Sequence, residues 1–424
     1  MRKVGGESCA GESAERRIVI VGGGYAGTTA AVNLGRSIRP EDGVEILLIE
    51  PNPCQEALSE LDLVAVGPPR PEFCELWHPA VFKDLPVTVC YERVDRVDPG
   101  RGVVVVGPRG EGGPEVAYWR LILSTGAVAF VPPVPGLAEN AVTMWSVEDA
   151  QELQSRITDA FKRAAKIPDR EARRRVLSFT VIGGGATGIE IAGTLGQMLP
   201  SRAADAGLDP EDLRVRVVEG RPQILYDLPE VGRMRAVRRM ERMGIELILG
   251  TMVKSVDAHT VFLEDGREVD AEVLVFCGGA RPDPDAVAWG LQADNAGRLV
   301  VDQTCRNPDH PEIYCAGDVC SFTDPKTNRT LPMLAQFAIA QARHVAGNIL
   351  REARGEALEP FKPHLHGEFV SVGPRWGVGT AFGVNFSGIP AIIMKRLTYV
   401  LYWWQIGGIP LAWKRTREMA AMQR

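Results

Sequence analysis

Two glycine-rich segments constrain the fold of this chain more than any other feature. The first, IVIVGGGYAGTTAAVNL, covers residues 18–34, and the second, FTVIGGGATGIEIAGTL, covers residues 179–195. Each has an apolar strand-like run, a Gly-x-Gly-x-x-Gly turn and small residues at helical spacing. Their separation far exceeds the length of a solenoid repeat. The pair therefore predicts an α/β fold with two Rossmann-like dinucleotide-binding domains.

The first motif places Gly22, Gly24 and Gly27 directly after the strand-like run. Such glycines allow a tight turn, close approach of the backbone to a pyrophosphate and tight packing of helix on strand. The pyrophosphate lies at the helix N-terminus, where free N–H groups favour anions. A second strand-like run, VEILLIE, ends in Glu50, whose carboxylate can accept hydrogen bonds from a ribose. The alternative is a glycine turn with a purely structural role.

The second motif places Gly183, Gly185 and Gly188 in the same way, and its acidic partner is Glu219, at the end of RVRVVE. We expect Glu219 to accept from the 2′-hydroxyl of NADH and to repel the 2′-phosphate of NADPH, a discrimination that the nearby Arg221 weakens. Two such sites in one chain indicate that one holds a flavin and the other a nicotinamide, between which a hydride can pass.

Composition limits the other possibilities. A net charge of −6 gives no electrostatic support to nucleic-acid binding. The polar N-terminus lacks the apolar core of a secretory signal, so we expect a cytoplasmic location. The eight cysteines have no metal-site spacing, so no metal is expected. The charges of the helical stretch ending in DREARRR are expected to form a solvated face.

The pattern of runs and linkers predicts the domain boundaries. The predicted domains are a flavin-binding domain in two parts (16–140 and 285–360), a nicotinamide-binding domain (141–284) and a C-terminal domain (361–424).

Two further segments link the chain to a known family. The run STGA covers residues 124–127, and YCAGDV covers 314–319. With the two glycine motifs, they resemble the two-dinucleotide-domain flavoproteins related to glutathione reductase. The resemblance implies that the first motif binds FAD, the second binds NAD(P)H, and Asp318 hydrogen-bonds the ribityl chain of the flavin. The implied FAD residues are Gly22, Gly24, Tyr25, Ala26, Gly27, Glu50, Thr125, Gly126, Gly317, Asp318, Ala335 and Gln336; the implied NADH residues are Gly183, Gly185, Ala186, Thr187, Gly188, Glu190, Glu219, Gly278 and Gly279.

Within that family the chain most resembles the type II NADH dehydrogenases, in residues 173–193, 331–349 and 367–383. The second stretch is similar to their quinone signature, Ala-Gln-x-Ala-x-Gln. Ala335, Gln336 and Ala338 match it, but Ala340 replaces the second glutamine and Gln341 comes one place later, a rotation of roughly 100° on a helix. The alternative is a packed helix of small residues.

This resemblance implies hydride transfer from NADH to FAD and reduction of a membrane quinone. Glu190, which orients the nicotinamide half, and Gln336 are the implied catalytic residues, and Gln336 and Gln341 the implied quinone contacts. For Glu190 the alternative is an exposed helix carboxylate.

Other functions stay open. A single-cysteine NAD(P)H-dependent thiol or disulfide reductase would use Cys54, four residues after Glu50. Cys315 and Cys320 straddle the flavin signature, and we interpret their spacing as coincidence. A ferredoxin-type reductase and a redox-sensing flavoprotein with slow turnover are further alternatives.

The C-terminal tail predicts attachment to a membrane surface. No segment reaches the roughly 20 apolar residues that a spanning helix needs. The longest uncharged run, 397–413, contains Gly407, Gly408 and Pro410 and is flanked by the cations Lys395, Arg396, Lys414, Arg415 and Arg417. Aromatic residues with basic flanks are typical of a bilayer interface. We therefore expect a peripheral protein on the cytoplasmic face of the cell membrane, in contact with anionic lipid. The expected membrane residues are Tyr399, Tyr402, Trp403, Trp404 and Trp413. The alternative is a helix packed on the body of the protein or in a homodimer interface.

Overall fold

The computed structural model describes residues 16–39, 42–67 and 70–421, and its contacts divide the chain into two compact units. The first unit comprises the chain up to Glu56, Glu75–Val128 and Ala280–Leu365. The second comprises Ala57–Cys74, Ala129–Gly279 and His366–Arg424. Residues 57–74 and the C-terminal segment are thus grouped with the second glycine motif, which the sequence-based division did not anticipate.

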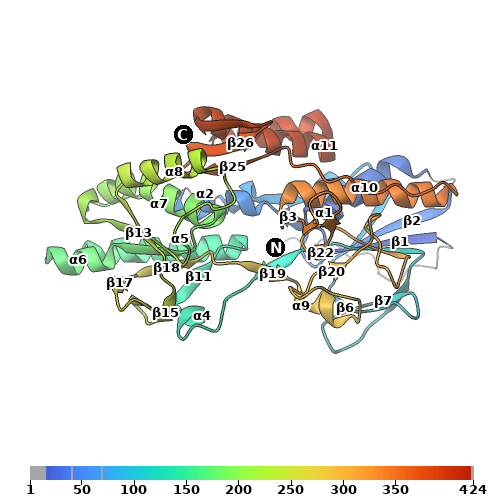
Figure 1. Cartoon of the computed structure of the whole chain (residues 1–424), viewed down its shortest axis with the longest axis horizontal. Coiled ribbons are helices and arrows are strands. Elements are labelled where there is room, and N and C mark those ends of the chain that lie inside the picture. Colours follow the sequence, from blue (N-terminus) through green and yellow to red (C-terminus); the bar gives the residue numbers. More distant parts are fainter. Residues whose placement is uncertain (1–15, 40–41, 68–69, 422–424) are drawn as a thin grey trace. The chain divides into compact units, whose positions relative to one another are not determined.

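The first unit is built on a five-stranded parallel sheet with the strand order β21-β9-β1-β2-β5. Buried aliphatic residues fill its strands, as expected for a parallel sheet covered on both faces. Helices α1 and α10 pack together on one face, and the antiparallel strands β6, β7 and β8 lie on the other (Figure 1). The bounds are β1 (Arg16–Val21), α1 (Tyr25–Ser37), β2 (Val44–Ile49), β5 (Val87–Cys90), β6 (Val94–Asp98), β7 (Val103–Val106), β8 (Glu115–Ala117), β9 (Arg120–Leu123), β21 (Ile313–Cys315) and α10 (Ala335–Ala353).

The second unit repeats this plan with the parallel order β11-β18-β12-β13-β14. Alternate residues of its strands enter two separate apolar cores. Val181, Val217 and Val275 pack on one face with α5 and α7, whereas Ile182, Val218 and Phe276 pack on the other with β15, β16 and β17. The bounds are β11 (Ala141–Thr143), α5 (Val147–Ala164), α6 (Arg170–Val176), β12 (Ser178–Ile182), α7 (Ala186–Asp205), β13 (Arg214–Glu219), α8 (Glu230–Arg242), β14 (Ile245–Leu249), β15 (Val253–Val256), β16 (Thr260–Leu263), β17 (Glu268–Asp270) and β18 (Val273–Phe276).

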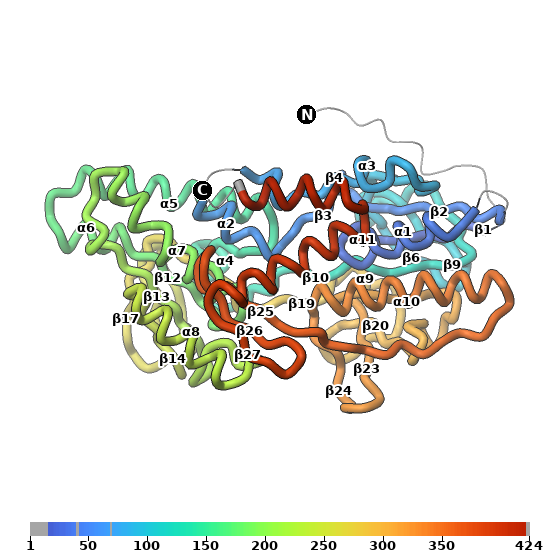
Figure 2. Tube along the Cα trace, turned by 90° about the horizontal axis from the view of Figure 1, so that it is seen from above, coloured from blue at the N-terminus to red at the C-terminus, as the bar shows by residue number. Residues whose placement is uncertain are grey.

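The C-terminal segment forms an antiparallel sheet, β25 (Gly367–Ser371), β26 (Gly377–Ala381) and β27 (Val384–Gly388), followed by α11 (Ile389–Ala421). The interruption expected from Gly407, Gly408 and Pro410 is confirmed: Gly408 adopts φ 68° and ψ −167°, and the second half of α11 runs back beside the first (Figure 2). Among the described residues, no helix is both long and apolar enough to cross a bilayer.

The short elements complete the chain. They are β3 (Cys54–Glu56), η2 (Leu58–Glu60), α2 (Leu61–Val66), η3 (Pro71–Phe73), β4 (Glu75–Trp77), α3 (His78–Val81), β10 (Ala127–Ala129), α4 (Leu137–Asn140), η4 (Pro210–Asp212), β19 (Ala280–Pro282), α9 (Pro284–Ala288), β20 (Leu299–Val300), β22 (Cys320–Ser321), β23 (Thr323–Asp324) and β24 (Arg329–Thr330).

Candidate functional site

The first glycine motif forms a closed loop at the carboxyl end of β1. Glu50, just after β2, accepts hydrogen bonds from Gly23 N at 2.6 Å and from Asn52 N at 2.9 Å. Burial raises the pKa of Glu50, and the two backbone hydrogen bonds oppose that rise. A side chain at Gly27 would bring its Cβ to 1.7 Å from the carbonyl oxygen of Gly22, so only glycine lets α1 begin this close to the strand.

The second motif has nearly the same geometry at the end of β12. Glu219 accepts from Gly184 N at 2.6 Å and from Arg221 N at 2.8 Å. A Cβ at Gly188 would lie 1.9 Å from the carbonyl oxygen of Gly183. Each unit therefore carries a strand, a glycine loop, a helix and a carboxylate that holds the loop.

Both loops leave room for a ligand at one glycine. Gly24 and Gly185 have ordinary backbone angles (φ −71° and −74°), and a Cβ on either would meet no protein atom within 4 Å. Each residue is also the N-cap of a helix, α1 or α7, and supplies no capping side chain. Backbone N–H groups in the first turn of an α-helix have no intrahelical acceptor and favour anions, and the open space at Gly24 and Gly185 suits the pyrophosphate of a dinucleotide.

The other residues expected at the first site gather at the same edge of the sheet, because the carboxyl ends of parallel strands coincide there. Thr125 and Gly126 follow β9, and Thr125 Oγ1 is buried with no hydrogen-bond partner among the described residues. Gly317 and Asp318 follow β21, and burial raises the pKa of Asp318. Tyr25 and Ala26 open α1.

Helix α10 contributes Ala335 and Gln336 in its first turn and Gln341 further along. The side-chain oxygen of Gln341 accepts from Gly317 N at 2.9 Å, so this residue supports the loop that carries Asp318. Gln341 and Asp318 line the same small cavity. Gln336, five residues before Gln341 on α10, is partly buried.

At the second site, Ala186 and Thr187 are exposed in the first turn of α7, and Gly278 and Gly279 follow β18. Glu190 is not an exposed helix carboxylate, so that alternative is wrong. It is 9 % exposed, forms an ion pair with Lys395 and accepts from Ser371 N at 2.9 Å.

The tail corrects part of the expected membrane surface. Trp404 and Trp413 are exposed, but Tyr402 and Trp403 are 6 % and 5 % exposed and pack inside the unit. Two expected surface cations are also inside: Lys395 pairs with Glu190, and Arg415 donates to the carbonyl oxygens of Phe73 and Glu72. The helix instead exposes an apolar stripe that the aromatic pattern did not identify: Ile389, Ile393, Leu397 and Leu401, at four-residue spacing.

Three other buried polar residues, His78, Glu60 and Asp62, were not expected from the sequence. His78 lies with Nε2 3.0 Å from the carbonyl oxygen of Gly23, and burial lowers its pKa. Glu60 and Asp62 are buried in the second unit. Nothing in the local sequence indicates these groups, because the hydrogen-bond partners of His78 and Asp62, Gly23 and Thr194, lie far along the chain.

The family model described as pyridine nucleotide-disulphide oxidoreductase matches residues 16–342. The chain belongs to this family. Type II NADH:quinone oxidoreductase of Staphylococcus aureus is 27% identical to it over 405 residues, which cover 94% of this chain and 98% of the relative. The Staphylococcus epidermidis protein of the same name is 26% identical over 412 residues, with the same coverage.

Solved structures show the same fold at lower identity. NDH2 from Plasmodium falciparum in complex with NADH has a TM-score of 0.82 at 14% identity and covers 93% of this chain and 96% of its own. The sulfide:quinone oxidoreductase from Aquifex aeolicus has a TM-score of 0.73 at 18% identity, with coverage of 92% and 91%. These matches cover 92% to 94% of this chain, so they extend into the C-terminal segment beyond the residues that the family model matches.

Proposed function

We propose that this protein is an FAD-dependent NADH:quinone oxidoreductase that works at a membrane surface. The observation that carries the proposal is the pair of equivalent glycine loops, each held by a carboxylate: residues 22–27 with Glu50, and residues 183–188 with Glu219. We call these two loops the cradles. The chain that contains them aligns over 94% of its length with a relative named for this activity. FAD supplies two-electron chemistry when bound, accepting a hydride and passing electrons on. The protein's part is to bind, orient and tune.

FAD is assigned to the first unit. The loop from Gly22 to Gly27 and the N-terminus of α1 would receive the pyrophosphate, and Glu50 the adenosine ribose. The buried, unpartnered Thr125 hydroxyl and the Asp318 carboxyl offer polar groups to the rest of the cofactor.

NADH is assigned to the second unit. Both Glu219 oxygens already accept backbone hydrogens, and each retains a lone pair for a ribose hydroxyl. The negative charge disfavours a 2′-phosphate. Arg221 lies 3.8 Å from the ring centroid of Tyr226, which restrains the cation that would otherwise favour NADPH. Glu190, fixed by Lys395 and Ser371 just beyond Gly188, is assigned to the nicotinamide half.

Gln336 is our choice for the quinone contact. Gln336 matches the first glutamine of the signature, whereas Gln341 is displaced by one position, and its side-chain oxygen accepts from Gly317 N. Replacing Gln336 by Ala is expected to slow quinone reduction at least tenfold while leaving FAD bound.

We place the membrane contact on the exposed α11 stripe together with Trp404, Ile409 and Trp413. Trp413 is followed directly by the exposed cation Lys414, and Arg417 is exposed one turn later. Exposed apolar side chains together with exposed cations favour an anionic bilayer surface. The cytoplasmic face of the cell membrane is the side we propose.

Binding to vesicles of mixed neutral and anionic phospholipid tests this surface. The double variant I393E/L397E should lose most vesicle binding. V231E is the matched control, because Val231 is an exposed apolar residue on α8. Equal loss in both variants, or none in I393E/L397E, contradicts the assignment. A stable homodimer that buries the stripe would also contradict it.

Stopped-flow spectroscopy of the flavin tests the activity. We expect fast reduction by NADH, slower reduction by NADPH, and reoxidation by a short-chain quinone far faster than by dissolved oxygen. Reoxidation by quinone no faster than by oxygen would overturn the quinone assignment. In that case loss of activity with a disulfide substrate in Cys54→Ser would identify a thiol reductase, and slow turnover with every acceptor would identify a redox sensor.

A further inference from the structure

A cavity in the second unit lies among η2, α2, β25 and α11, and the proposed function leaves most of its polar lining without a role. The empty volume of this cavity, including the part that is continuous with solvent, is about 380 Å³. Glu60 and Asp62 line it from one side, and Lys395, Arg396 and Tyr399 of α11 line it from another. All these residues belong to one compact unit.

The direct contacts in this cavity leave negative charge uncompensated. Lys395 Nζ donates to Glu190 and, at 3.1 Å, to Ser371 Oγ. Asp62 accepts from Thr194 Oγ1 at 2.6 Å. No hydrogen bond or ion pair reaches the carboxyl of Glu60 within the part of the chain that the structure describes, although Glu60 is only 5 % exposed. A polar group buried to this degree, without a partner and facing a cavity, indicates a ligand.

The smallest ligand that satisfies a buried carboxylate is a proton. Burial raises the pKa of Glu60 to about 7, opposed by Arg415, Lys395 and Arg396 on α11 and assisted by the charge of Asp62. Burial and the charge of Glu190 raise the pKa of Asp62 to about 6, opposed by Lys395 and by the Thr194 hydroxyl. Both groups therefore exchange protons near neutral pH.

Asp62 is also connected to the nicotinamide site. Thr194, its hydrogen-bond donor, lies four residues after Glu190 on α7, and side chains at this spacing lie on one face of a helix. Glu190 in turn binds Lys395, which lines the cavity. Asp62 with Thr194, and Lys395 with Glu190, thus connect the cavity to the helix face that carries Glu190.

We propose that Glu60 and Asp62 are proton-loading residues, which hold the proton that each turnover consumes and release it through the Glu190–Lys395 pair. This inference rests on the proposed function. Oxidation of NADH by a quinone follows NADH + H⁺ + Q → NAD⁺ + QH₂, so NADH loses two electrons with a hydride and the quinone gains two electrons and two protons. One of those protons comes from the medium. In our proposal an O–H bond of Asp62 or Glu60 breaks to supply it, and water at the open side of the cavity reprotonates the carboxylate.

The test separates the two half-reactions in the variant Asp62→Asn. Reduction of the flavin by NADH should stay within about twofold of the wild-type rate. Reoxidation by a short-chain quinone should slow at least tenfold and lose its dependence on pH between about 5 and 8, the range around the two pKa values. Asp62→Glu should restore much of both. Glu72→Gln removes an exposed carboxylate of the same segment and should change nothing.

Equal slowing of both half-reactions would assign Asp62 a merely structural role and overturn the proposal, as would an unchanged pH profile in Asp62→Asn. Infrared spectroscopy distinguishes this failure from failure of the quinone assignment. The wild-type protein at pH 6 should show a protonated carboxylic acid band that Asp62→Asn diminishes, whichever acceptor the flavin uses. If the variant retains the full band, the pair does not hold the proton.

Discussion

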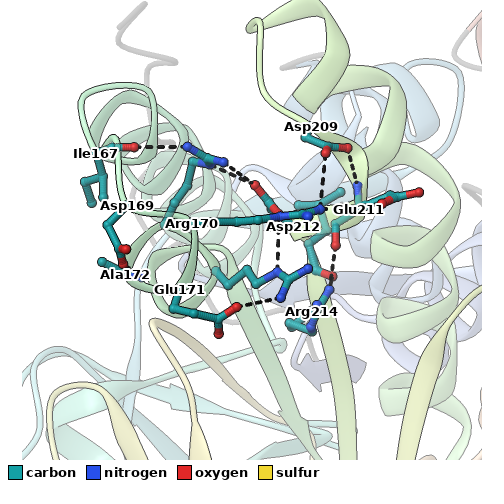
Figure 3. A network of polar contacts seen from close by, with 12 residues as sticks. Ile167, Asp169, Arg170, Glu171, Ala172, Asp209, Glu211, Asp212 and Arg214 are labelled. Atoms are coloured by element: carbon teal, nitrogen blue, oxygen red, sulfur yellow. Dashed lines mark hydrogen bonds and ion pairs between the residues drawn. The ribbon is translucent and has the colours of Figure 1, made fainter.

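Two clusters of charged residues in the second unit use the same side-chain types with opposite results. Around Asp212, three arginines converge on one carboxylate (Figure 3). In the carboxyl-rich cluster, formed by Glu60, Asp62 and Glu190, Lys395 is in direct contact with Glu190, and Asp62 accepts from the hydroxyl of Thr194. The buried carboxylate of the first cluster thus contacts three cations, whereas Glu60 and Asp62 in the second have no cation in direct contact among the described residues.

The protonation behaviour follows this balance. Burial alone would raise the pKa of Asp212, which is 0 % exposed, but hydrogen bonds from Arg170 and Arg173 outweigh burial and lower it to about 2. In the other cluster burial prevails, and the pKa values of Glu60 and Asp62 rise to about 7 and about 6. A buried carboxylate is therefore a structural ion-pair partner in one place and a proton acceptor in the other, according to the cations that can reach it.

The largest effect is expected from Lys395→Met, which removes the cation of the carboxyl-rich cluster. Glu190 would stay buried without its partner, and we expect a loss of about 4 kcal/mol in the free energy of unfolding at pH 8. The loss should shrink at pH 5, where Glu60 and Asp62 are protonated. Denaturant unfolding of the full chain measures it.

Lys414→Met is the control for this change. Lys414 is exposed and lies 4.0 Å from Glu418, so its removal should cost less than about 0.5 kcal/mol. If both variants unfold at the same denaturant concentration, the buried pair does not stabilise the fold.

A smaller loss, about 3 kcal/mol, is expected from Asp212→Asn, since three arginines lose their common acceptor. The pKa of Asp212 in the folded protein lies below the ordinary value of 3.8. Its contribution is thus fully present above that pH and is lost as the pH falls through about 2. Thermal unfolding between pH 2 and pH 7 should show a difference between wild type and variant that vanishes at the acidic end.

Asp265→Asn is the matched control, because Asp265 pairs with Arg267 at the surface. An equal effect of the two substitutions would remove the distinction between a buried and an exposed carboxylate.

For a substitution at Glu60, the expected change in the free energy of unfolding has the opposite sign. Glu60→Gln is expected to stabilise the protein by about 2 kcal/mol at pH 8 and hardly at all at pH 5. The folded-state pKa of about 7 exceeds the ordinary value of 4.5, so the folded protein binds the extra proton between those values. Stability therefore falls as the pH rises through this window, and the cost of the charge is complete above it. Destabilisation at pH 8 would mean that the Glu60 carboxylate has a partner after all.

Sequence reasoning located the two cradles because their information is local. A strand, three glycines, a helix start and an acidic residue at the next strand end lie within about 40 residues of chain, and the parallel sheet then brings the strand ends together. The same reasoning expected the charges of DREARRR to form a solvated face, and no residue of α6 is buried. It did not predict that Arg170, Arg173 and Arg174 bind Asp212 of η4. That partner is separated from them by β12 and α7, and no local pattern indicates it.

The carboxyl-rich cluster was missed for the same reason. Asp62 meets Thr194 and Lys395 only because residues 57–74 fold with the second unit. The prediction for the tail was partly wrong for a different reason. It chose the membrane-facing residues by their aromatic character, and two of them, Tyr402 and Trp403, are buried. The exposed stripe consists instead of the aliphatic residues Ile389, Ile393, Leu397 and Leu401.

The smallest effect on the free energy of unfolding is expected from Thr194→Val, which tests the carboxyl-rich cluster alone. Thr194→Val keeps the volume of a fully buried side chain and removes the hydroxyl that donates to Asp62. We expect a loss of about 1 kcal/mol at pH 8, where the acceptor is charged, and a smaller loss at pH 5. Because the hydroxyl favours the charged form, its removal should raise the pKa of Asp62 further and shift the pH profile of flavin reoxidation to higher pH.

Thr158→Val is the matched control. Thr158 also donates a side-chain hydrogen bond, but its acceptor is uncharged, the carbonyl oxygen of Gln154 in α5. A stability loss in Thr194→Val without any shift in that profile would separate the hydrogen bond from the proton-loading role and leave Asp62 as a structural residue like Asp212.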